Sequence, residues 1–229
     1  MMRLAPEGWP FLLPLLGLTA LAAAGAALLP ESASFWGAVV TGGAWVFGIL
    51  AAFTAFFFRN PRRNRRDADR LVLAPGDGRV VEIVQVDEPD FFAEPATRIS
   101  IFLSIFNVHI QRAPITGRVA LRTFKEGKFS AAWNSHASED NEQATLGFIS
   151  DGYRVMVRQI AGLVARRIVT DPEEGELVPQ GSRIGIIRFG SRVDLFLPVG
   201  WPVTCKIGDR VRGGLTAMAR IPKEEASKT

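Results

Sequence analysis

The hydrophobic positions divide the chain into two parts. Near the N-terminus, two apolar stretches without a charged residue run from Phe11 to Leu29 and from Phe35 to Phe58. Each could cross a hydrocarbon core of ~30 Å, which takes roughly 20 helical residues. A second stretch follows the first at once, and both exceed the apolar region of about 7–15 residues that is typical of a cleaved signal peptide. The pattern therefore predicts a helical hairpin that spans a membrane or enters one leaflet of it.

After residue 70, apolar and polar positions alternate in short segments, as is typical of β-strands. Strands are expected in six segments: Arg79–Val86, Arg98–Phe106, Arg118–Phe124, Arg154–Ile160, Arg183–Phe189 and Arg192–Leu197. Weak helix signals occur at Ala137–Gln143 and Ile160–Arg167. We predict a mainly β (α+β) fold, in which an N-terminal membrane hairpin with a basic segment (residues 1–66) precedes a β-rich domain (residues 67–229).

Charge and cysteine content narrow the possible functions. The formal net charge is +4, but six arginines are concentrated directly after the second apolar stretch: Arg59, Arg62, Arg63, Arg65, Arg66 and Arg70. This placement favours an anionic membrane surface over nucleic acid as the partner. The positive-inside bias then places the domain that follows in the cytoplasm. The single cysteine, Cys205, excludes an intramolecular disulfide.

Motifs for bound metals or nucleotides are absent from the sequence. The two histidines, His109 and His136, are far apart and lie in no HxH or HxxxH pattern, so no metal site is expected. No glycine-rich phosphate-binding motif follows a strand segment, which argues against a nucleotide cofactor. His136 lies in a polar segment, and we expect it to have no chemical role.

Three short segments carry candidate chemistry, but each also has an ordinary structural explanation. His109 follows a strongly apolar segment and precedes a proline turn, where a histidine can simply end a strand. Asp77 lies between two glycines, as a turn residue would. Gly190 and Ser191 join two strand segments, which suggests a hairpin turn whose two strands pair in one sheet. None of the three segments alone identifies a function.

Taken together and in this order, six segments resemble the phosphatidylserine decarboxylase family in its short form. They are Phe57-Phe58-Arg59-Asn60-Pro61-Arg62, Ala74-Pro75-Gly76-Asp77-Gly78, Val108-His109-Ile110-Gln111-Arg112-Ala113-Pro114, Ser138-Glu139-Asp140-Asn141-Glu142, Gln159-Ile160-Ala161-Gly162-Leu163-Val164-Ala165-Arg166-Arg167 and Phe189-Gly190-Ser191-Arg192. Long members of the family have Leu-Gly-Ser-Thr where this chain has Phe-Gly-Ser-Arg. They also have a second histidine where this chain has Arg112. These departures leave open how the acid and base roles are divided.

The resemblance implies a proenzyme that cuts itself between Gly190 and Ser191. The products would be a large subunit, residues 1–190, and a small subunit, residues 191–229, that stay together. Ser191 would become a covalent pyruvoyl group, the cofactor with which the enzyme converts phosphatidylserine to phosphatidylethanolamine. A pyruvoyl carbonyl supplies the electron sink that a decarboxylation needs.

The resemblance also implies roles for other residues. His109 would be the base and Asp77 the carboxylate that orients it. Two roles stay open for Arg112 and Arg118: they bind the lipid phosphate, or they are solvated charges at strand ends. Membrane lipid is an expected partner at the cell membrane, and assembly into a homo-oligomer is compatible with the resemblance.

A non-enzymatic alternative is a membrane-anchored adaptor with a barrel like those of lipoyl and biotinyl domains. The segment Lys206-Ile207-Gly208-Asp209-Arg210-Val211-Arg212-Gly213-Gly214 favours it, because its Lys-x-Gly-Asp-x-Val run is common in those barrels. The alternative predicts a lysine at a hairpin tip for attachment of the group, whereas the corresponding turn here contains Gly190 and Ser191. A serine hydrolase is disfavoured because GxSxG is absent.

Overall fold

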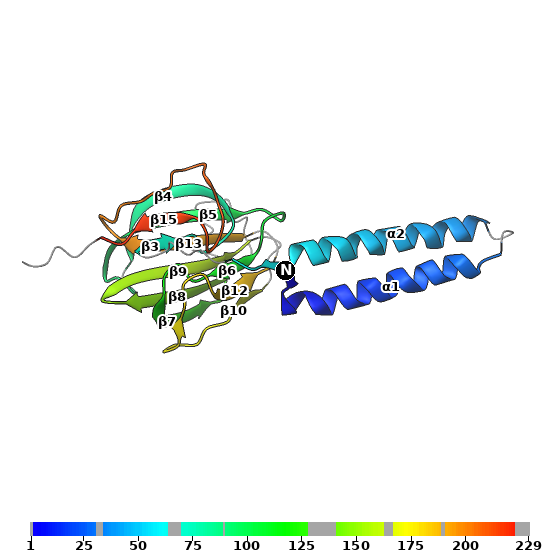
Figure 1. The fold of residues 1–229 in the computed structure, drawn as a ribbon, viewed down its shortest axis with the longest axis horizontal. Coiled ribbons are helices and arrows are strands. Elements are labelled where there is room, and N and C mark those ends of the chain that lie inside the picture. The colour runs from blue at the N-terminus through cyan, green and yellow to red at the C-terminus, as the bar shows by residue number, and fades with distance from the viewer. Residues whose placement is uncertain are drawn as a thin grey trace, which may run out of the picture. The chain divides into compact units, whose positions relative to one another are not determined.

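The computed structural model describes residues 2–30, 34–63, 70–88, 90–127, 141–162, 167–188 and 191–222. The chain forms two compact units, Met1–Arg62 and Arg63–Thr229. The elements in chain order are β1 (Met2–Leu4), a 3-10 turn η1 (Pro6–Gly8), α1 (Trp9–Leu28), α2 (Ser34–Phe57), β2 (Arg59–Pro61), β3 (Leu71–Leu73), β4 (Gly78–Glu88), β5 (Glu94–Leu103), β6 (Ile110–Arg112), β7 (Gly117–Lys125), β8 (Gln143–Ser150), β9 (Tyr153–Ala161), β10 (Ile168–Thr170), β11 (Leu177–Val178), β12 (Arg183–Ile187), β13 (Ser191–Pro198), β14 (Arg210–Val211) and β15 (Ala217–Arg220) (Figure 1).

The first unit is a helical hairpin. Helices α1 and α2 lie side by side in Figure 1, and each is long and apolar enough to cross a membrane. Large apolar side chains along both helices are exposed, as expected of a surface that meets lipid: Trp9, Leu13, Leu16, Leu21, Leu28, Phe35, Trp36, Trp45, Val46 and Ile49. Gly48 faces Thr19 across the pair, and a Cβ there would make ordinary van der Waals contact with the Thr19 methyl at 3.7 Å. The sequence pattern predicted this helical pair.

The open end of the hairpin is closed by backbone pairing. Strand β1 pairs with β2 in antiparallel register, and the Ala5 amide donates to the Phe58 carbonyl at 2.8 Å. Phe58 is buried and packs on Gly8, where a Cβ would lie 2.7 Å from the Phe58 Cβ. Any larger residue at position 8 would therefore push the two ends of the hairpin apart.

The second unit consists of antiparallel sheets. An eight-stranded sheet has the order β11-β7-β8-β9-β13-β5-β4-β14, a three-stranded sheet has the order β10-β12-β6, and β15 pairs with β3. One apolar core joins them, because it contains Val193 and Leu195 of β13 together with Ile184 of β12, Val72 of β3 and Met218 of β15. The mainly β fold with an N-terminal helical pair is as the sequence predicted.

Strand β13 lies in the middle of the large sheet and is buried on both faces. Val193, Leu195 and Leu197 face the main core, whereas Phe196 packs on the other face against Phe91 and other apolar residues. Because each of its residues from Ser191 to Leu197 is buried, β13 reads as a nearly continuous run rather than an alternating one. It is the strand that begins at the serine singled out by the sequence.

Two expectations about local structure were wrong. The strands on either side of Gly190 and Ser191 do not form a hairpin, because β12 belongs to the three-stranded sheet and β13 to the eight-stranded one. The helix expected at Ile160–Arg167 does not begin at Ile160, because Ile160 and Ala161 continue β9 and pair with β13; residues 163–166 lie outside the described residues. In both cases pairing between distant segments overrides the local signal.

The described part of Ala137–Gln143 does not form the helix that the sequence predicted. Residues 137–140 lie outside the described residues, Asn141 forms an isolated β-bridge and Gln143 begins β8. Strand β8 itself was not expected from the sequence. All six predicted strand segments correspond to strands of the described residues, namely β4, β5, β7, β9, β12 and β13, while Phe189 lies outside those residues.

Candidate active site

Ser191 begins β13 and lies opposite Leu103 of β5 on one side and Ala161 of β9 on the other. Alternation along the strand places its side chain on the same face as Val193 and Leu195, toward the main core. The residue is fully buried. Its Oγ has no hydrogen-bond partner among the described residues. A buried hydroxyl without a partner carries a desolvation cost, and a catalytic role is one reason for which such a group is retained.

His109 follows a tight turn that begins directly after the Leu103 position. In this turn the Ser104 amide and hydroxyl both donate to Asn107 Oδ1, at 2.9 and 2.8 Å. The Asn107 carbonyl oxygen lies 3.1 Å from Nδ1 of His109, and the imidazole is fully buried. Because a carbonyl oxygen only accepts, Nδ1 must carry the proton in this contact, which leaves Nε2 as the basic nitrogen of the neutral ring.

Strand register and backbone contacts place His109 beside the end of β12 and Ser191 at the start of β13. The Ile187 amide donates to the His109 carbonyl at 3.4 Å, so His109 lies beside the last residue of β12. Ser191, at the far end of residues 188–191, pairs with Leu103, from which the turn leading to His109 starts. Both candidate residues therefore lie where the chain passes from the three-stranded to the eight-stranded sheet.

Asp77 lies in the turn before β4 and is held by other partners. Arg63 binds its carboxylate in two-pronged fashion, with Nη2 at 2.7 Å from Oδ2 and Nη1 on Oδ1. The Gly213 amide donates to Oδ1 at 2.8 Å, and Arg63 Nη1 donates back to the Gly213 carbonyl at 2.7 Å. Among the described contacts of Asp77 there is none with His109. The structure thus places Asp77 in a buried ion pair rather than in a hydrogen bond to the imidazole.

The backbone at the start of β4 approaches β5 very closely. A Cβ on Gly78 would lie 2.1 Å from the Phe102 carbonyl oxygen, so only glycine fits beside Asp77. This approach is what sets the Asp77 turn next to the end of β5, where Ser191 is paired. The glycine that looked like a turn residue in the sequence is therefore a packing requirement.

The arginines considered from the sequence bind backbone carbonyls. Arg112 is buried and its Nη1 donates to the Gly181 carbonyl at 2.9 Å, while Arg118 donates to the Gly175 carbonyl. Burial lowers the pKa of Arg112, and the positive charge of Arg63 adds to this effect while Asp77 opposes it. These contacts give both side chains a structural role.

A buried ion pair fixes β13 immediately after Ser191. Arg192 Nε donates to Asp194 Oδ1 at 2.7 Å, and Arg192 Nη2 donates to the Ser100 hydroxyl of β5 at 2.7 Å. Arg192 and Asp194 lie on the face of the strand opposite Ser191, because side chains alternate along it. The pair thus holds the first residues of β13 on the sheet independently of the chain before them.

Several residues at this site were not predicted from the sequence. Arg63 was recognised only as one of a basic run, and Ser104 and Asn107 gave no signal, because their contacts depend on the turn geometry. Gly190, on the other side of the expected cut, and His136 lie outside the described residues. Within the ranges that the structure describes, no group of three or more histidine, cysteine, aspartate or glutamate side chains could hold a metal ion.

Comparisons with known proteins identify the family to which the chain is similar. The family model described as phosphatidylserine decarboxylase matches residues 50–219. A phosphatidylserine decarboxylase proenzyme of Symbiobacterium thermophilum is 45% identical over 221 residues, which are 96% of this chain and 96% of that protein. Proteins of the same name from Magnetococcus marinus and Xanthobacter autotrophicus are 39% and 41% identical, each over 97% of this chain and over 97% and 91% of their own lengths.

These relatives extend over the N-terminal hairpin, which the family model only reaches at residue 50. The similarity is thus a property of the whole chain. The adaptor alternative finds no support among the comparisons, since the relatives reported above are all named as decarboxylase proenzymes.

Proposed function

The chain belongs to the phosphatidylserine decarboxylase family, and we propose that it converts phosphatidylserine to phosphatidylethanolamine with a pyruvoyl group that it makes by cutting itself between Gly190 and Ser191. The observation that supports self-cleavage best is the state of the Ser191 hydroxyl. It is fully buried without a hydrogen-bond partner in the described residues, at the first position of a strand that is paired on both sides.

In the proposed cleavage, Ser191 Oγ attacks the Gly190 carbonyl carbon and the peptide nitrogen leaves, which gives an ester and a free amine. Removal of the Ser191 α-proton then breaks the Cβ–Oγ bond and releases residues 1–190 with a carboxylate end. Water replaces the nitrogen of the remaining dehydroalanine, ammonia departs, and a pyruvoyl group caps residues 191–229. A base is required for the first two proton transfers.

His109 is our candidate for that base. Its Nδ1 proton is directed to the Asn107 carbonyl, which makes Nε2 the nitrogen that accepts protons. The histidine is carried beside Ile187 at one end of the junction, and Ser191 starts the strand at the other end. We assign the same histidine to the return of a proton to the substrate carbon after carbon dioxide leaves.

Asp77 is the third residue of the proposed site. Its carboxylate, held by Arg63 and Gly213, fixes the turn before β4 at the end of β5. We propose that it orients His109 in the step where the imidazole carries the additional proton, because a carboxylate stabilises an imidazolium nearby. This step requires the Arg63 contact to loosen.

The residues present fit a group derived from Ser191. Its carbonyl would supply the electron sink that accepts the electron pair of the carbon–carbon bond broken when carbon dioxide leaves the substrate. Strands β5 and β9 hold position 191 from both sides, and the Arg192 to Asp194 ion pair fixes the residues that follow. This chain would therefore keep the group in place without a link to residue 190.

We further propose that residues 1–66 form the membrane hairpin and basic segment and residues 67–229 the catalytic domain. The apolar helices would anchor the enzyme in the cell membrane, where the lipid substrate resides. The arginines after residue 58 support a cytoplasmic location of the catalytic domain, because the positive-inside bias keeps such clusters on the cytoplasmic side.

Intact-mass analysis of the full chain tests the proposal. The expected result is two fragments divided before residue 191, of which the smaller has lost ammonia and gained a carbonyl group. Replacement of His109 by alanine should slow the cut by ~10²–10⁴-fold, the usual contribution of a general base. His136→Ala is the matched control and should mature normally. An active preparation that consists of one uncut chain would refute self-cleavage.

A further inference from the structure

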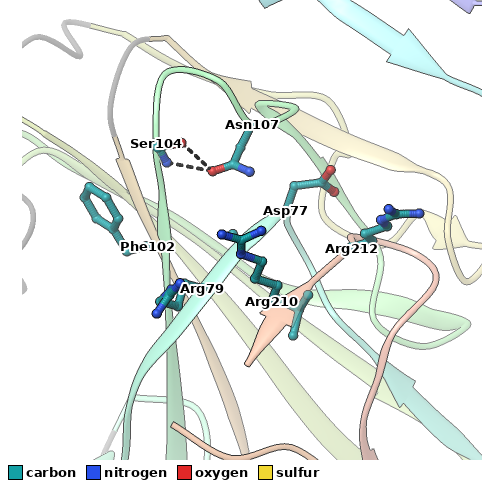
Figure 2. A pocket seen from close by; sticks show the side chains of 9 residues that line it. Asp77, Arg79, Phe102, Ser104, Asn107, Arg210 and Arg212 are labelled. Atoms are coloured by element: carbon teal, nitrogen blue, oxygen red, sulfur yellow. Dashed lines mark hydrogen bonds between the residues drawn. The ribbon is translucent and has the colours of Figure 1, made fainter. Parts of the chain in front are cut away.

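A cavity of about 580 Å³ lies at the end of β4, β5 and β14 and is lined by Asp77, the Ser104–Asn107 turn and three arginines, Arg79, Arg210 and Arg212. Figure 2 shows the arginine side chains together with Asp77 below that turn. The cavity borders the candidate active site, because Asn107 both lines it and accepts the hydrogen bond from His109. Ser191 and His109 do not line it.

The strand register explains why two of these arginines, Arg79 and Arg210, lie side by side. Arg79 of β4 lies directly opposite Arg210 of β14 and, on its other side, opposite Phe102 of β5. Arg212 follows directly after the end of β14 and lines the same cavity. Like charges directly opposite each other destabilise a sheet, and an anion between them would remove that penalty.

None of the three arginines is neutralised by the protein within the described residues. Other arginines of the domain form ion pairs, among them Arg98 with Glu82 and Arg158 with Glu88. Among the described residues that line the cavity, Asp77 alone carries a carboxylate, and Arg63 is paired with it. The cavity therefore has a positive surplus next to the proposed reaction centre.

The chemistry of the lining favours a phosphodiester with an apolar part. Guanidinium groups bind phosphate oxygens through paired N–H donors, and do so better than single ammonium groups. At the tip of the Ser104–Asn107 turn, Ile105 and Phe106 are 42% and 65% exposed, although both are large and apolar. Arginines beside exposed apolar side chains suit an amphiphile, whose anionic head group would contact the arginines and whose apolar part would contact the apolar side chains.

We propose that Arg79, Arg210 and Arg212 bind the phosphodiester of the serine phospholipid substrate, which rests on the function proposed above. In this lipid a single methylene group separates the phosphate ester oxygen from the carbon that bears the amine and the carboxylate. A phosphate held by the three arginines would therefore bring the reacting carbon toward the end of β5, opposite the start of β13. The three arginines select the substrate and take no part in proton transfer.

Binding can be tested apart from turnover with the uncut Ser191→Ala full chain in detergent. The probe is glycerophosphoserine, which has the phosphodiester and serine but no acyl chains, and binding is measured calorimetrically at low salt. Arg79→Gln, Arg210→Gln and Arg212→Gln should each weaken its binding roughly tenfold or more, the loss expected for one charge-assisted contact. Arg220→Gln removes an exposed arginine outside the cavity and should leave the binding unchanged.

A second arm distinguishes the source of the phosphate. Inorganic phosphate should bind more weakly than glycerophosphoserine, and free serine should be insensitive to the three substitutions. If inorganic phosphate bound as tightly as glycerophosphoserine, the site would be one for free phosphate and the proposal would be overturned. Unchanged glycerophosphoserine binding in all three variants would overturn it as well.

Kinetics of the mature chain separate this proposal from the function on which it rests. The arginine variants should raise KM for soluble short-chain phosphatidylserine and leave kcat nearly unchanged, because they remove binding shared by substrate and transition state. Decarboxylation with normal KM in all three variants would refute the arginine site but leave the decarboxylase intact. Loss of probe binding in the variants of a chain that never decarboxylates would refute the function and leave the phosphate site.

Discussion

Arg63 and Asp77 form a two-pronged ion pair in which both side chains are almost completely buried, with 7% and 11% of their surfaces exposed. Arg63 is the first residue of the second unit, directly after the hairpin unit. The pair therefore ties the start of the second unit to a turn at the candidate active site. The Gly213 backbone completes the cluster by contacting both side chains.

Removing one member of this pair should be costly. Arg63→Gln leaves the Asp77 carboxylate buried without its cation and should destabilise the domain by about 3 kcal/mol, as for other buried ion pairs broken on one side. The adjacent Arg62 is exposed, so Arg62→Gln should change the free energy of unfolding by less than ~0.5 kcal/mol. Thermal unfolding in detergent measures both. Equal melting temperatures for the two variants would contradict the prediction.

The small fragment should stay bound after the cut. Each of its strands pairs with strands of residues 1–190: β13 with β5 and β9, β14 with β4, and β15 with β3. Residues 191–229 should therefore elute with the large fragment in native size-exclusion chromatography and separate from it only in denaturant. Elution of the small fragment alone in native buffer would be incompatible with this register.

Packing of β13 should control how firmly the small fragment is held. Leu195→Ala removes a fully buried side chain and should lower the stability of the cut complex by about 2–5 kcal/mol. Val199→Ala, at a position 44% exposed just after the strand, is the control and should have a much smaller effect. The denaturant concentration at which the fragments separate is the readout, and a similar shift for both variants would argue against a buried β13.

The single cysteine should react slowly in the folded protein. Burial raises the pKa of the Cys205 thiol to about 11, and the negative charge of Asp209 adds to the shift. At pH 8 iodoacetamide should therefore alkylate the native chain at least ~tenfold more slowly than the unfolded chain, since only the thiolate reacts. The rate should climb as the pH approaches 11. Equal rates for native and unfolded chains at pH 8 would show that the thiol is not shielded.

The raised pKa of Cys205 also makes the stability of the folded chain depend on pH. The thiol of the unfolded chain loses its proton near the usual thiol pKa of about 8.5, whereas the folded chain keeps this proton to higher pH. The contribution of Cys205 is therefore fully present below that pH and declines as the pH rises toward about 11. Cys205→Ala should reduce this part of the loss of stability at high pH.

The hairpin should be needed for action on bilayers but not for self-cleavage. The main core of the second unit is built from residues 72 onward, and deletion of residues 1–58 spares both this core and Arg63. The truncated chain should cut itself and act on soluble short-chain phosphatidylserine, yet turn over vesicle lipid slowly because it lacks the anchor. Comparable vesicle rates for the truncated and full chains would show that the hairpin is not the anchor.

Local patterns in the sequence were sufficient for the helical pair and for six of the described strands, whereas the short strands and β8 were not predicted. Phe11–Leu29 and Phe35–Phe58 are recognisable because the length and polarity of a membrane helix are local properties. Period-two alternation likewise located β4, β7 and β9. The resemblance of six ordered segments singled out Ser191, His109 and Asp77 as candidates.

Only the tertiary structure decided which of these elements pair with or contact one another. It separated β12 from β13 into different sheets, paired Asp77 with Arg63, and set Arg79 opposite Arg210. Arg79 and Arg210 are distant in sequence, and the register that joins them depends on the packing of the whole sheet. Periodicity tells which face a side chain occupies, but not which strand will be its neighbour, because that choice is made by the burial of a core assembled from many segments.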